Sequence, residues 1–291
     1  MSHRDDPAHG ATHAAPTRRR MERLTTPDGT TLSYERSGSG PALVLVHGAF
    51  SDSASNWDLV RPALAERFTL YAIDRRGRGE TTATEGHRLA DEAADVAALI
   101  AALGEPVFLL GHSYGAHCAL VAALLVPDRI RKLVLYEAAY PDLLTSEAMA
   151  RLEPLAAADA WDDFATTFFR DLLCVPAPEV EALRASELWP AIVTDAKASL
   201  RDLRALRAYR FDAERWSGLD VPVLLQIGTE SPRHFYVSDA LAAVLPDARI
   251  GELAGQAHEA MTTAPDLYAR AVTDFLLGSR EAARGPRVTA P

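Results

Sequence analysis

The sequence predicts an α/β fold: a mostly parallel, eight-stranded sheet flanked by helices, with a helical segment inserted between two strands. Short apolar runs, such as residues 42–46 and 107–110, have the composition of buried parallel strands. Helix-forming segments alternate with these runs at a spacing that favours right-handed crossovers. No good strand is apparent between about Asp142 and Leu219, and the apolar run 221–228 then resumes the sheet. The sequence therefore predicts one α/β core that is interrupted by a helical insertion.

Composition and turn residues justify the elements in order. Pro27-Asp28-Gly29 is a hairpin signal between the first two strands, and Gly104 ends a helix whose apolar residues recur at helical spacing. The expected strands span residues 23–26, 31–35, 42–46, 69–73, 107–110, 132–136, 223–227 and 249–253. The expected helices outside the insertion span residues 56–68, 89–103, 117–125, 236–245 and 265–277.

These elements define the expected domain organisation. A helical cap, 141–216, separates the two parts of the core, and a tail is expected at each end. The core comprises residues 22–140 and 217–278, the disordered N-terminal tail 1–21 and the C-terminal tail 279–291. The N-terminal tail is polar and lacks the apolar region of a secretory signal. Cys118 and Cys174 are the only cysteines, which fits a reducing compartment, so we expect a cytoplasmic protein.

The charge of the chain bears on its partners. The formal net charge is −10, whereas binding to a nucleic-acid backbone or an anionic membrane surface needs basic patches. No apolar run approaches the ~20 residues that span a bilayer. The expected partner is a small-molecule substrate, with no nucleic acid and no membrane, and the sequence leaves the oligomeric state open.

A glycine-flanked serine joins a predicted strand to a predicted helix. Residues 107–110 are apolar, Gly111-His112-Ser113-Tyr114-Gly115 follows, and the next residues are rich in alanine and leucine. Such a turn is too tight for side chains on either flank of the serine, and glycine supplies the room. The turn lifts the Ser113 hydroxyl out of the sheet, towards the free N–H groups of the helix start.

Further polar residues follow the strands of the predicted sheet. Ligands and catalytic groups gather at the carboxyl ends of strands in open parallel sheets. The residues at these ends are His47, Asp74, Ser113, Glu137, Glu230 and His258. Their shared location predicts one functional site along this edge of the sheet.

These features resemble the α/β-hydrolase superfamily with a helical cap. The resemblance covers about Leu24 to Leu277, and it rests on His47-Gly48-Ala49, residues 74–79, the Gly-x-Ser-x-Gly turn and the late His258. It implies Ser113 as nucleophile and His258 as its base, because an imidazole titrates near neutral pH. It also implies an oxyanion hole formed by the backbone N–H groups of Ala49 and Tyr114.

The sequence leaves the acid of this triad open. In the superfamily the acid usually follows the strand that here spans 223–227, but the usual position holds Ser231, which carries no negative charge. Glu230 lies one residue too early, so its side chain is expected to point elsewhere. Glu137 ends the preceding strand, where some relatives place their acid. We favour Glu137, with Glu230 as the alternative.

Aromatic residues of the cap predict an apolar substrate pocket. Trp161, Phe164 and Phe168 fall at i, i+3 and i+7, with Leu172 continuing the stripe. Such a stripe forms either the cap core or a substrate wall. The expected substrate-binding residues are Phe50, His47, Trp161, Phe164 and Phe168, and Tyr114 is expected to line the same pocket.

The basic residues and the histidines bear on other kinds of site. Arg75, Arg76 and Arg78 follow one strand, and we expect them to brace that turn through salt bridges rather than to bind an anion. Beyond His47, His112, His117 and His258, the histidines have no partners at metal-ligand spacing. We therefore expect neither a metal nor another cofactor.

The resulting hypothesis is a serine hydrolase that cleaves an ester, lactone or thioester of a small apolar molecule through an acyl-enzyme. Carbon–carbon bond hydrolysis and perhydrolysis use the same triad and remain open. The alternative from another class is a non-hydrolytic member of the fold, a small-ligand binder or a cyclase, because a fold does not fix a function.

Overall fold

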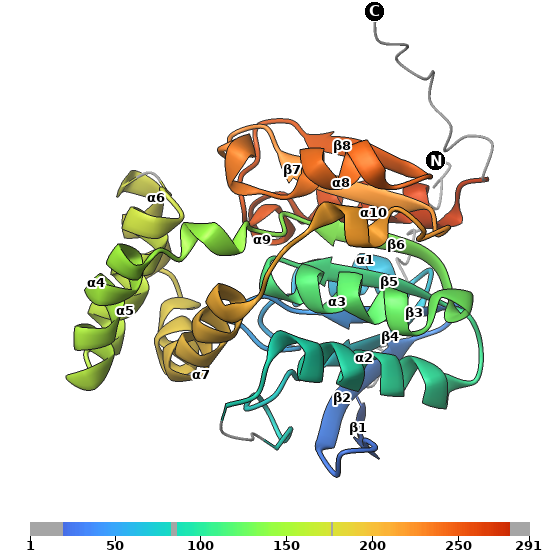
Figure 1. Ribbon diagram of the computed structural model, residues 1–291, viewed down its shortest axis with the longest axis horizontal. Coiled ribbons are helices and arrows are strands. Elements are labelled where there is room, and N and C mark those ends of the chain that lie inside the picture. The colour runs from blue at the N-terminus through green and yellow to red at the C-terminus, as the bar shows by residue number, and fades with distance from the viewer. Residues whose placement is uncertain (1–19, 83–85, 176, 280–291) are drawn as a thin grey trace, which may run out of the picture.

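The computed structural model describes residues 20–82, 86–175 and 177–279, and it is built on one eight-stranded sheet (Figure 1). The spatial order of the strands is β1-β2-β4-β3-β5-β6-β7-β8. They span Arg20–Thr25 (β1), Thr31–Gly38 (β2), Ala42–Val46 (β3), Thr69–Ile73 (β4), Val107–His112 (β5), Ile130–Tyr136 (β6), Val223–Gly228 (β7) and Ala248–Leu253 (β8). β2 pairs antiparallel with β1 and β4, and every other pair is parallel. The predicted mostly parallel α/β sheet is confirmed.

Helices cover both faces of the sheet. α2 (Leu89–Leu103), α3 (Tyr114–Leu125) and α8 (Ser238–Val244) share one core, whereas α1 (Arg61–Ala65), α9 (Ala260–Thr263) and α10 (Pro265–Leu277) share the other. Strand alternation separates the two cores, because Val44 and Val46 of β3 join the first and Leu43 and Leu45 the second. The polar ends of the parallel strands therefore emerge between two packed apolar layers.

The helix expected over residues 56–68 is much shorter, because only Arg61–Ala65 is helical. Turns precede it, and their backbone is held by the Asp52 side chain, which accepts from the N–H groups of Ala54 and Ser55. Pro62 stands at the start of the helix, where its fixed φ and missing N–H cost least. The loop after β3 is thus irregular, which matters for the site because it carries His47 to Phe50.

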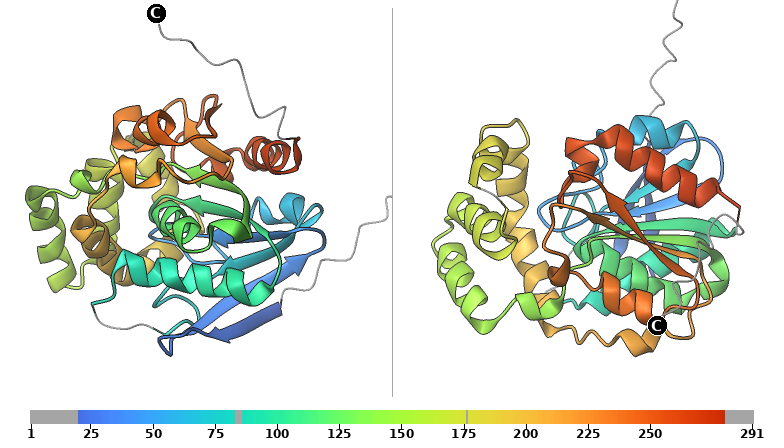
Figure 2. Two further views of the ribbon diagram at one scale, coloured as in Figure 1. Left: turned by 45° about the vertical axis from the view of Figure 1, so that its right-hand side comes forward. Right: turned by 90° about the horizontal axis from the view of Figure 1, so that it is seen from above.

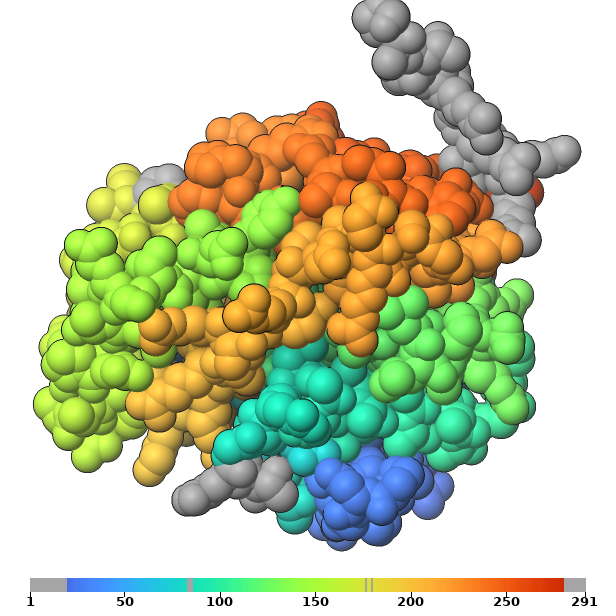
Figure 3. All heavy atoms as spheres, in the orientation of Figure 1, coloured from blue at the N-terminus to red at the C-terminus, as the bar shows by residue number. Residues whose placement is uncertain are grey.

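The regular elements in the described part of the segment between β6 and β7 are all helical. It contains α4 (Ser146–Ala157), α5 (Trp161–Thr167), α6 (Ala177–Arg184) and α7 (Trp189–Ala208), with a π-helical turn, Phe168–Leu172, after α5 and short 3-10 turns at Pro141–Leu143 and Ala213–Trp216. Figures 1 and 2 show these helices gathered beside the sheet, with α7 nearer to the core than α4 and α5. The space-filling view shows the same helices as one lobe of the surface (Figure 3).

The tails expected from the sequence lie mostly outside the described residues, which exclude 1–19 and 280–291. β1 begins at Arg20, three residues earlier than expected, because Arg20 pairs with Arg36 across the hairpin. Among the described helices, none is long and apolar enough to cross a membrane.

Candidate active site

Ser113 lies on a strained turn between β5 and α3. Its backbone φ is 54° and ψ is −120°, a conformation that non-glycine residues rarely adopt. The flanking glycines are required by close approach: a Cβ on Gly115 would lie 2.3 Å from the carbonyl oxygen of His47, and one on Gly111 would lie 2.6 Å from Ala116 Cα. The Ser113 N–H donates to the Tyr136 carbonyl over 2.8 Å, which fixes the turn against β6.

Glu137 and His258 meet at the same edge of the sheet. Glu137 follows β6 with a φ of 50°, and its side chain is fully buried. Its Oε1 accepts from the N–H of Gly228 over 2.8 Å, and its Oε2 lies 2.7 Å from His258 Nδ1. One carboxylate therefore connects the end of β7 with the imidazole that follows β8.

This contact determines the tautomer and the pKa of His258. Burial by itself lowers the pKa of the imidazole, but the hydrogen bond and the charge of Glu137 outweigh burial, so the pKa of His258 lies above its ordinary value of 6.5. Because a carboxylate can only accept, Nδ1 carries the proton in this contact. Nε2 is then the free acceptor of the neutral ring, and it has no hydrogen-bond partner among the described residues.

His112, which precedes Ser113 in the chain, contacts His258. The Nε2 atom of His112 lies 3.1 Å from the His258 carbonyl oxygen, and the two imidazole centroids are 4.7 Å apart. Within the described part of the chain, the Ser113 hydroxyl makes no hydrogen bond, to His258 or to any other residue. Catalytic hydrogen bonds are often long before substrate binds, so this geometry is compatible with a Ser–His pair.

Glu230, the alternative acid, lies elsewhere. Its side chain is exposed, and its one hydrogen bond among the described residues comes from the Thr229 hydroxyl, over 3.3 Å. Glu230 therefore does not contact the imidazole of His258. Of the two carboxylates that the sequence offered, only Glu137 is in position to orient that ring.

Two backbone N–H groups beside Ser113 are free to bind an oxygen atom. Those of Ala49 and Tyr114 have no hydrogen-bond partner among the described residues. Ala49 follows β3 and Tyr114 begins α3, and both line one small cavity together with Ser113. These two N–H groups are therefore candidates for an oxyanion hole, which needs donors that converge where a carbonyl oxygen becomes charged.

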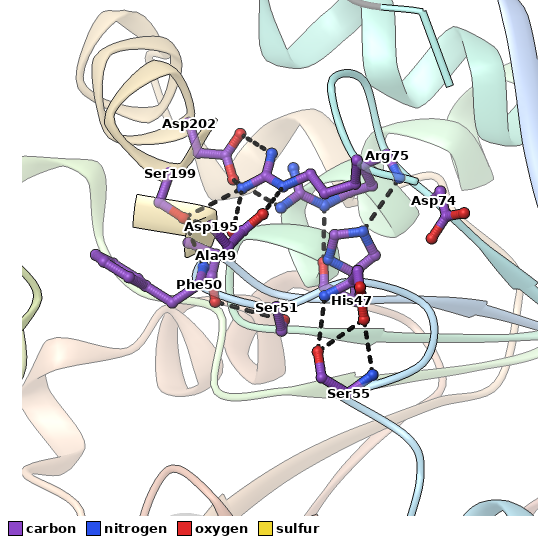
Figure 4. Close-up of polar contacts among 12 residues, drawn as sticks. His47, Ala49, Phe50, Ser51, Ser55, Asp74, Arg75, Asp195, Ser199 and Asp202 are labelled. Carbon is purple, nitrogen blue, oxygen red and sulfur yellow. Dashed lines mark hydrogen bonds and ion pairs between the residues drawn. The ribbon is translucent and has the colours of Figure 1, made fainter. Parts of the chain in front are cut away.

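A buried arginine supports the loop that carries Ala49 (Figure 4). Arg75 Nε donates to the His47 carbonyl over 2.8 Å, and its Nη2 donates to the Gly48 carbonyl over 2.7 Å. The same guanidinium pairs with Glu92 at 2.9 Å and with Asp202 at 2.7 Å. Because Asp202 belongs to α7, this arginine connects the loop after β3 with the cap.

A second contact from α7 reaches the same loop. The Ser199 hydroxyl accepts from the Phe50 N–H over 2.7 Å and donates to Asp195 over 2.8 Å (Figure 4). Arg78 pairs with both Asp195 and Asp202. The arginines therefore brace this region through salt bridges, as the sequence predicts, and the third of them, Arg76, pairs with Asp95 and Asp28.

His47 takes part in this framework rather than lining a cavity. The side chain is fully buried, with Nδ1 2.8 Å from the Gly48 carbonyl oxygen and Nε2 accepting from the Arg75 N–H over 3.1 Å. Burial, together with the charge of Arg75, lowers the pKa of this imidazole well below its ordinary range. The neutral ring is thus held by backbone groups on both sides. It lines neither of the two cavities that Ala49 lines.

Two cavities meet at Ala49. The smaller has a volume of about 30 Å³ and is lined by Ser113, Tyr114 and leucines of the segment between β6 and β7. The larger, of about 280 Å³, is lined by Phe50, Phe169, the side chains of α6 and α7 and Glu259. Ala49 therefore lines both cavities, whereas Ser113 lines the smaller one.

The aromatic residues expected to bind substrate divide between these cavities and the cap core. Phe50 lines the larger cavity and Phe168 the smaller one, whereas Trp161 and Phe164 line neither. The ring centroid of Phe50 lies 4.6 Å from that of Phe168 and 5.9 Å from that of Phe164. The helical period changes within this stripe, because α5 ends at Thr167 and a π-helical turn follows it.

Two groups of three metal-ligand side chains come together among the described residues, His112 with His258 and Glu259, and His87 with Glu92 and Asp202. In the second group, Arg75 already pairs with both carboxylates. In the first, His258 Nδ1 is bonded to Glu137, and His112 Nε2 faces a carbonyl oxygen. Each group therefore leaves few ligand atoms for a metal ion.

Sequence reasoning missed the residues of α7 and Glu259. Asp195, Ser199 and Asp202 recur at i, i+4 and i+7, a polar stripe on a cap helix that could have been matched to the arginines after β4. Glu259 has no comparable signal, because only the fold shows that its side chain faces a cavity.

Comparisons with known proteins match this chain to one family, to individual relatives and to solved structures. A family model described as "Alpha/beta hydrolase family" matches residues 43–271. The chain is 29% identical over 268 residues to 2-(acetamidomethylene)succinate hydrolase from Mesorhizobium japonicum, covering 84% of this chain and 91% of that protein. It is 27% identical over 274 residues to a non-heme haloperoxidase from Rhodococcus erythropolis, covering 88% and 99% of the two chains. The crystal structure of an alpha/beta hydrolase from Sphaerobacter thermophilus superimposes with a TM-score of 0.75 at 32% identity, covering 87% of this chain and 99% of that one.

Proposed function

The chain belongs to the alpha/beta hydrolase family, and from this premise we propose that it is a serine hydrolase that cleaves an ester, lactone or thioester of a small apolar molecule through an acyl-enzyme. The family and its hydrolase relatives support hydrolysis as the general activity. The serine mechanism and the bond that is cleaved are the parts that we propose.

The observation that carries this proposal is the 2.7 Å contact between Glu137 and His258 Nδ1. It leaves Nε2 free to take the proton of the Ser113 hydroxyl as the serine oxygen attacks the carbonyl carbon. The imidazolium then gives this proton to the leaving oxygen or sulfur, and the acyl group stays on Ser113. Water, deprotonated by the same imidazole, releases the acid and restores the serine.

The free N–H groups of Ala49 and Tyr114 supply the electrostatic part of this mechanism. They would donate to the oxyanion of the tetrahedral intermediate, in the smaller cavity that Ala49, Ser113 and Tyr114 line. Losing one such donor typically costs ~10²–10³ in kcat. Arg75 keeps the Ala49 donor in place by holding the carbonyl oxygens of His47 and Gly48, so its role is positioning rather than chemistry.

The two cavities suggest how a substrate would lie. Ser113 lines the smaller cavity and Ala49 lines both, so we place the acyl and leaving parts of the substrate in different cavities. The leaving group must receive its proton from His258, and Glu259, the next residue, lines the larger cavity. We therefore assign the leaving group to the larger cavity and a short acyl group, of about acetyl size, to the smaller one.

We expect this chain to act on a different substrate from that of the Mesorhizobium relative. That protein is named for a succinate, which is a dicarboxylate. The described residues that line the two cavities here include no arginine, lysine or histidine. We therefore expect a substrate whose buried parts are not anionic.

A fluorophosphonate probe followed by peptide mapping tests the proposed nucleophile. We expect one label, on Ser113, and a loss of ~10⁶ in kcat for ester hydrolysis in Ser113→Ala, by analogy with the triad of a serine protease. Ser217→Ala is the matched control, because Ser217 is exposed and its hydroxyl bonds, among the described residues, only to the Glu214 carbonyl. Labelling of another residue, or activity retained by Ser113→Ala, would refute the mechanism.

The haloperoxidase relative favours testing perhydrolysis as a second activity of the same site. Here hydrogen peroxide replaces water as the nucleophile that attacks the acyl-enzyme, and a peracid leaves. Peracid formed from an acetate ester and peroxide by the wild type, but not by Ser113→Ala, would establish it. Formation at equal rates in both variants would exclude it.

A further inference from the structure

The larger cavity combines an apolar wall with one ionisable group. Its volume is about 280 Å³, and Phe50, Phe169, Leu183 and Ile192 contribute to its surface. Among the described residues that line it, Glu259 is the only one with an ionisable side chain. The cavity is therefore an apolar pocket with a single acidic group among the described residues that line it.

Glu259 is available to a ligand. Its carboxylate makes no hydrogen bond or ion pair within the described part of the chain, in contrast to Glu137, whose oxygens both have partners. The basic group that acts on it is His258: burial raises the pKa of the Glu259 carboxyl group, and the charge of His258 opposes this rise. A carboxylate that is removed from water without a partner is costly, and a bound cation would offset this cost.

The position of Glu259 relates it to the leaving group. One of its carboxylate oxygens lies within 4.8 Å of a ring nitrogen of His258. If His258 Nε2 protonates the leaving oxygen, a substituent a few bonds further along the same leaving group would lie near Glu259. The rings of Phe50 and Phe169 lie 5.2 Å apart in the same wall, and aromatic faces attract bulky ammonium ions.

We propose that Glu259, together with Phe50 and Phe169, recognises an ammonium group on the leaving alcohol, so that the preferred substrates are short-chain acyl esters of amino alcohols. This inference rests on the proposed esterase function, because that function assigns the leaving group to the larger cavity. It predicts that a substrate with a carboxylate at the same place is rejected, since it would meet the unpaired charge of Glu259.

Three acetate esters that differ in one charge test this proposal. They are the acetate ester of choline, 3,3-dimethylbutyl acetate as its uncharged isostere, and the acetate ester of 3-hydroxypropanoate. We expect kcat/KM to be about tenfold or more higher for the cation than for the isostere, and lowest for the anion. In Glu259→Gln the ratio of the first two values should fall close to one.

Two variants make the comparison specific. Glu230→Gln removes the same charge from an exposed position and should keep the ratio of the wild type. Glu259→Asp retains the charge and should keep a preference for the cation, even where shortening lowers the absolute rates. A wild type that does not discriminate between the cation and its isostere, or a Glu259→Gln variant that still does, would overturn the proposal.

Measurements of choline binding test the ammonium site independently of the proposed esterase function. Calorimetry with choline and 3,3-dimethylbutanol requires no turnover, and choline should bind more tightly to the wild type but not to Glu259→Gln. Such binding without any ester hydrolysis or Ser113 labelling would refute the esterase mechanism and leave the ammonium site standing. Ester hydrolysis without a preference for choline would refute the ammonium site alone.

Discussion

Two buried clusters of acids and bases lie at the same edge of the sheet, and they differ in whether their charge can change. In one, Glu137 holds His258, whose second ring nitrogen is free. In the other, Asp202 pairs with Arg75 and Arg78, two guanidiniums that stay charged at any physiological pH. The first is suited to moving a proton, whereas the second is suited to holding the loop after β3 against the cap.

The pKa values of the two clusters follow this division. The charges of Arg75 and Arg78 outweigh burial and hold the pKa of Asp202 well below its usual range. Glu137 raises the pKa of His258 against the effect of burial, which keeps that imidazole titratable above 6.5. A buried ion pair can therefore serve as a fixed brace or as a catalytic switch, depending on whether its basic partner titrates near neutral pH.

The largest effect should come from Glu137→Gln. The amide would donate to His258 Nδ1 and stabilise the tautomer with the proton on Nε2, which cannot accept from Ser113. We expect ester hydrolysis to lose ~10⁴ in kcat, judging from the protease precedent. Steady-state kinetics measure this loss, with Glu230→Gln as the matched control that should keep nearly full activity. Similar small losses in both variants would mean that neither carboxylate orients the imidazole.

The acid illustrates where sequence reasoning ends. Glu137 and Glu230 both follow strands, so their positions in the chain do not separate them. The decision depends on side-chain direction: Glu137 has a positive φ and is pinned by the Gly228 N–H, while Glu230 points to solvent. Neither property is encoded in a local pattern of residues.

The sheet and the Ser113 turn were predictable because their signals are local. Apolar runs, strand alternation and flanking glycines determine them within a few residues of sequence. The brace, by which we mean the salt bridges of Arg75 and Arg78 with acids of α7, was only partly predictable. The arginines after β4 indicated salt bridges, but Arg75 and Asp202 are 127 positions apart. Pairing at that distance depends on how the cap packs, and so do the two cavities at Ala49.

The brace should be broken by Asp202→Asn, which leaves two buried guanidiniums without their shared carboxylate. Removing one partner of a buried pair typically costs about 3–5 kcal/mol, and we expect a loss of this size in the free energy of unfolding. Denaturant titration measures it. Asp195→Asn is the control, since that side chain is 15% exposed and shares Arg78 only, so its loss should be smaller. Equal stability of Asp202→Asn and the wild type would contradict the proposed bracing role.

A smaller effect is expected from Ser199→Ala. This change leaves the buried Phe50 N–H without its acceptor, at a cost of about 1–3 kcal/mol in the free energy of unfolding. Because Phe50 follows Ala49, kcat should fall a few-fold while KM changes little. Ser199→Thr keeps the hydroxyl and should restore kcat. A Thr variant as slow as the Ala variant would attribute the loss to packing rather than to the hydrogen bond.

The smallest expected effect is a shift in the pH dependence of kcat/KM, and this shift should distinguish the two clusters. His258 must be neutral to accept a proton, and its pKa is raised, so kcat/KM should rise with pH along a limb whose midpoint lies above 6.5. Stability has the opposite sign: the charged pair contributes fully below pH 6.5, and this contribution is lost as pH rises through the pKa of the folded state. Glu137→Gln should move the activity limb to lower pH, whereas Asp202→Asn should leave it in place. A shift of the same size in both variants would mean that the two clusters act as one electrostatic unit.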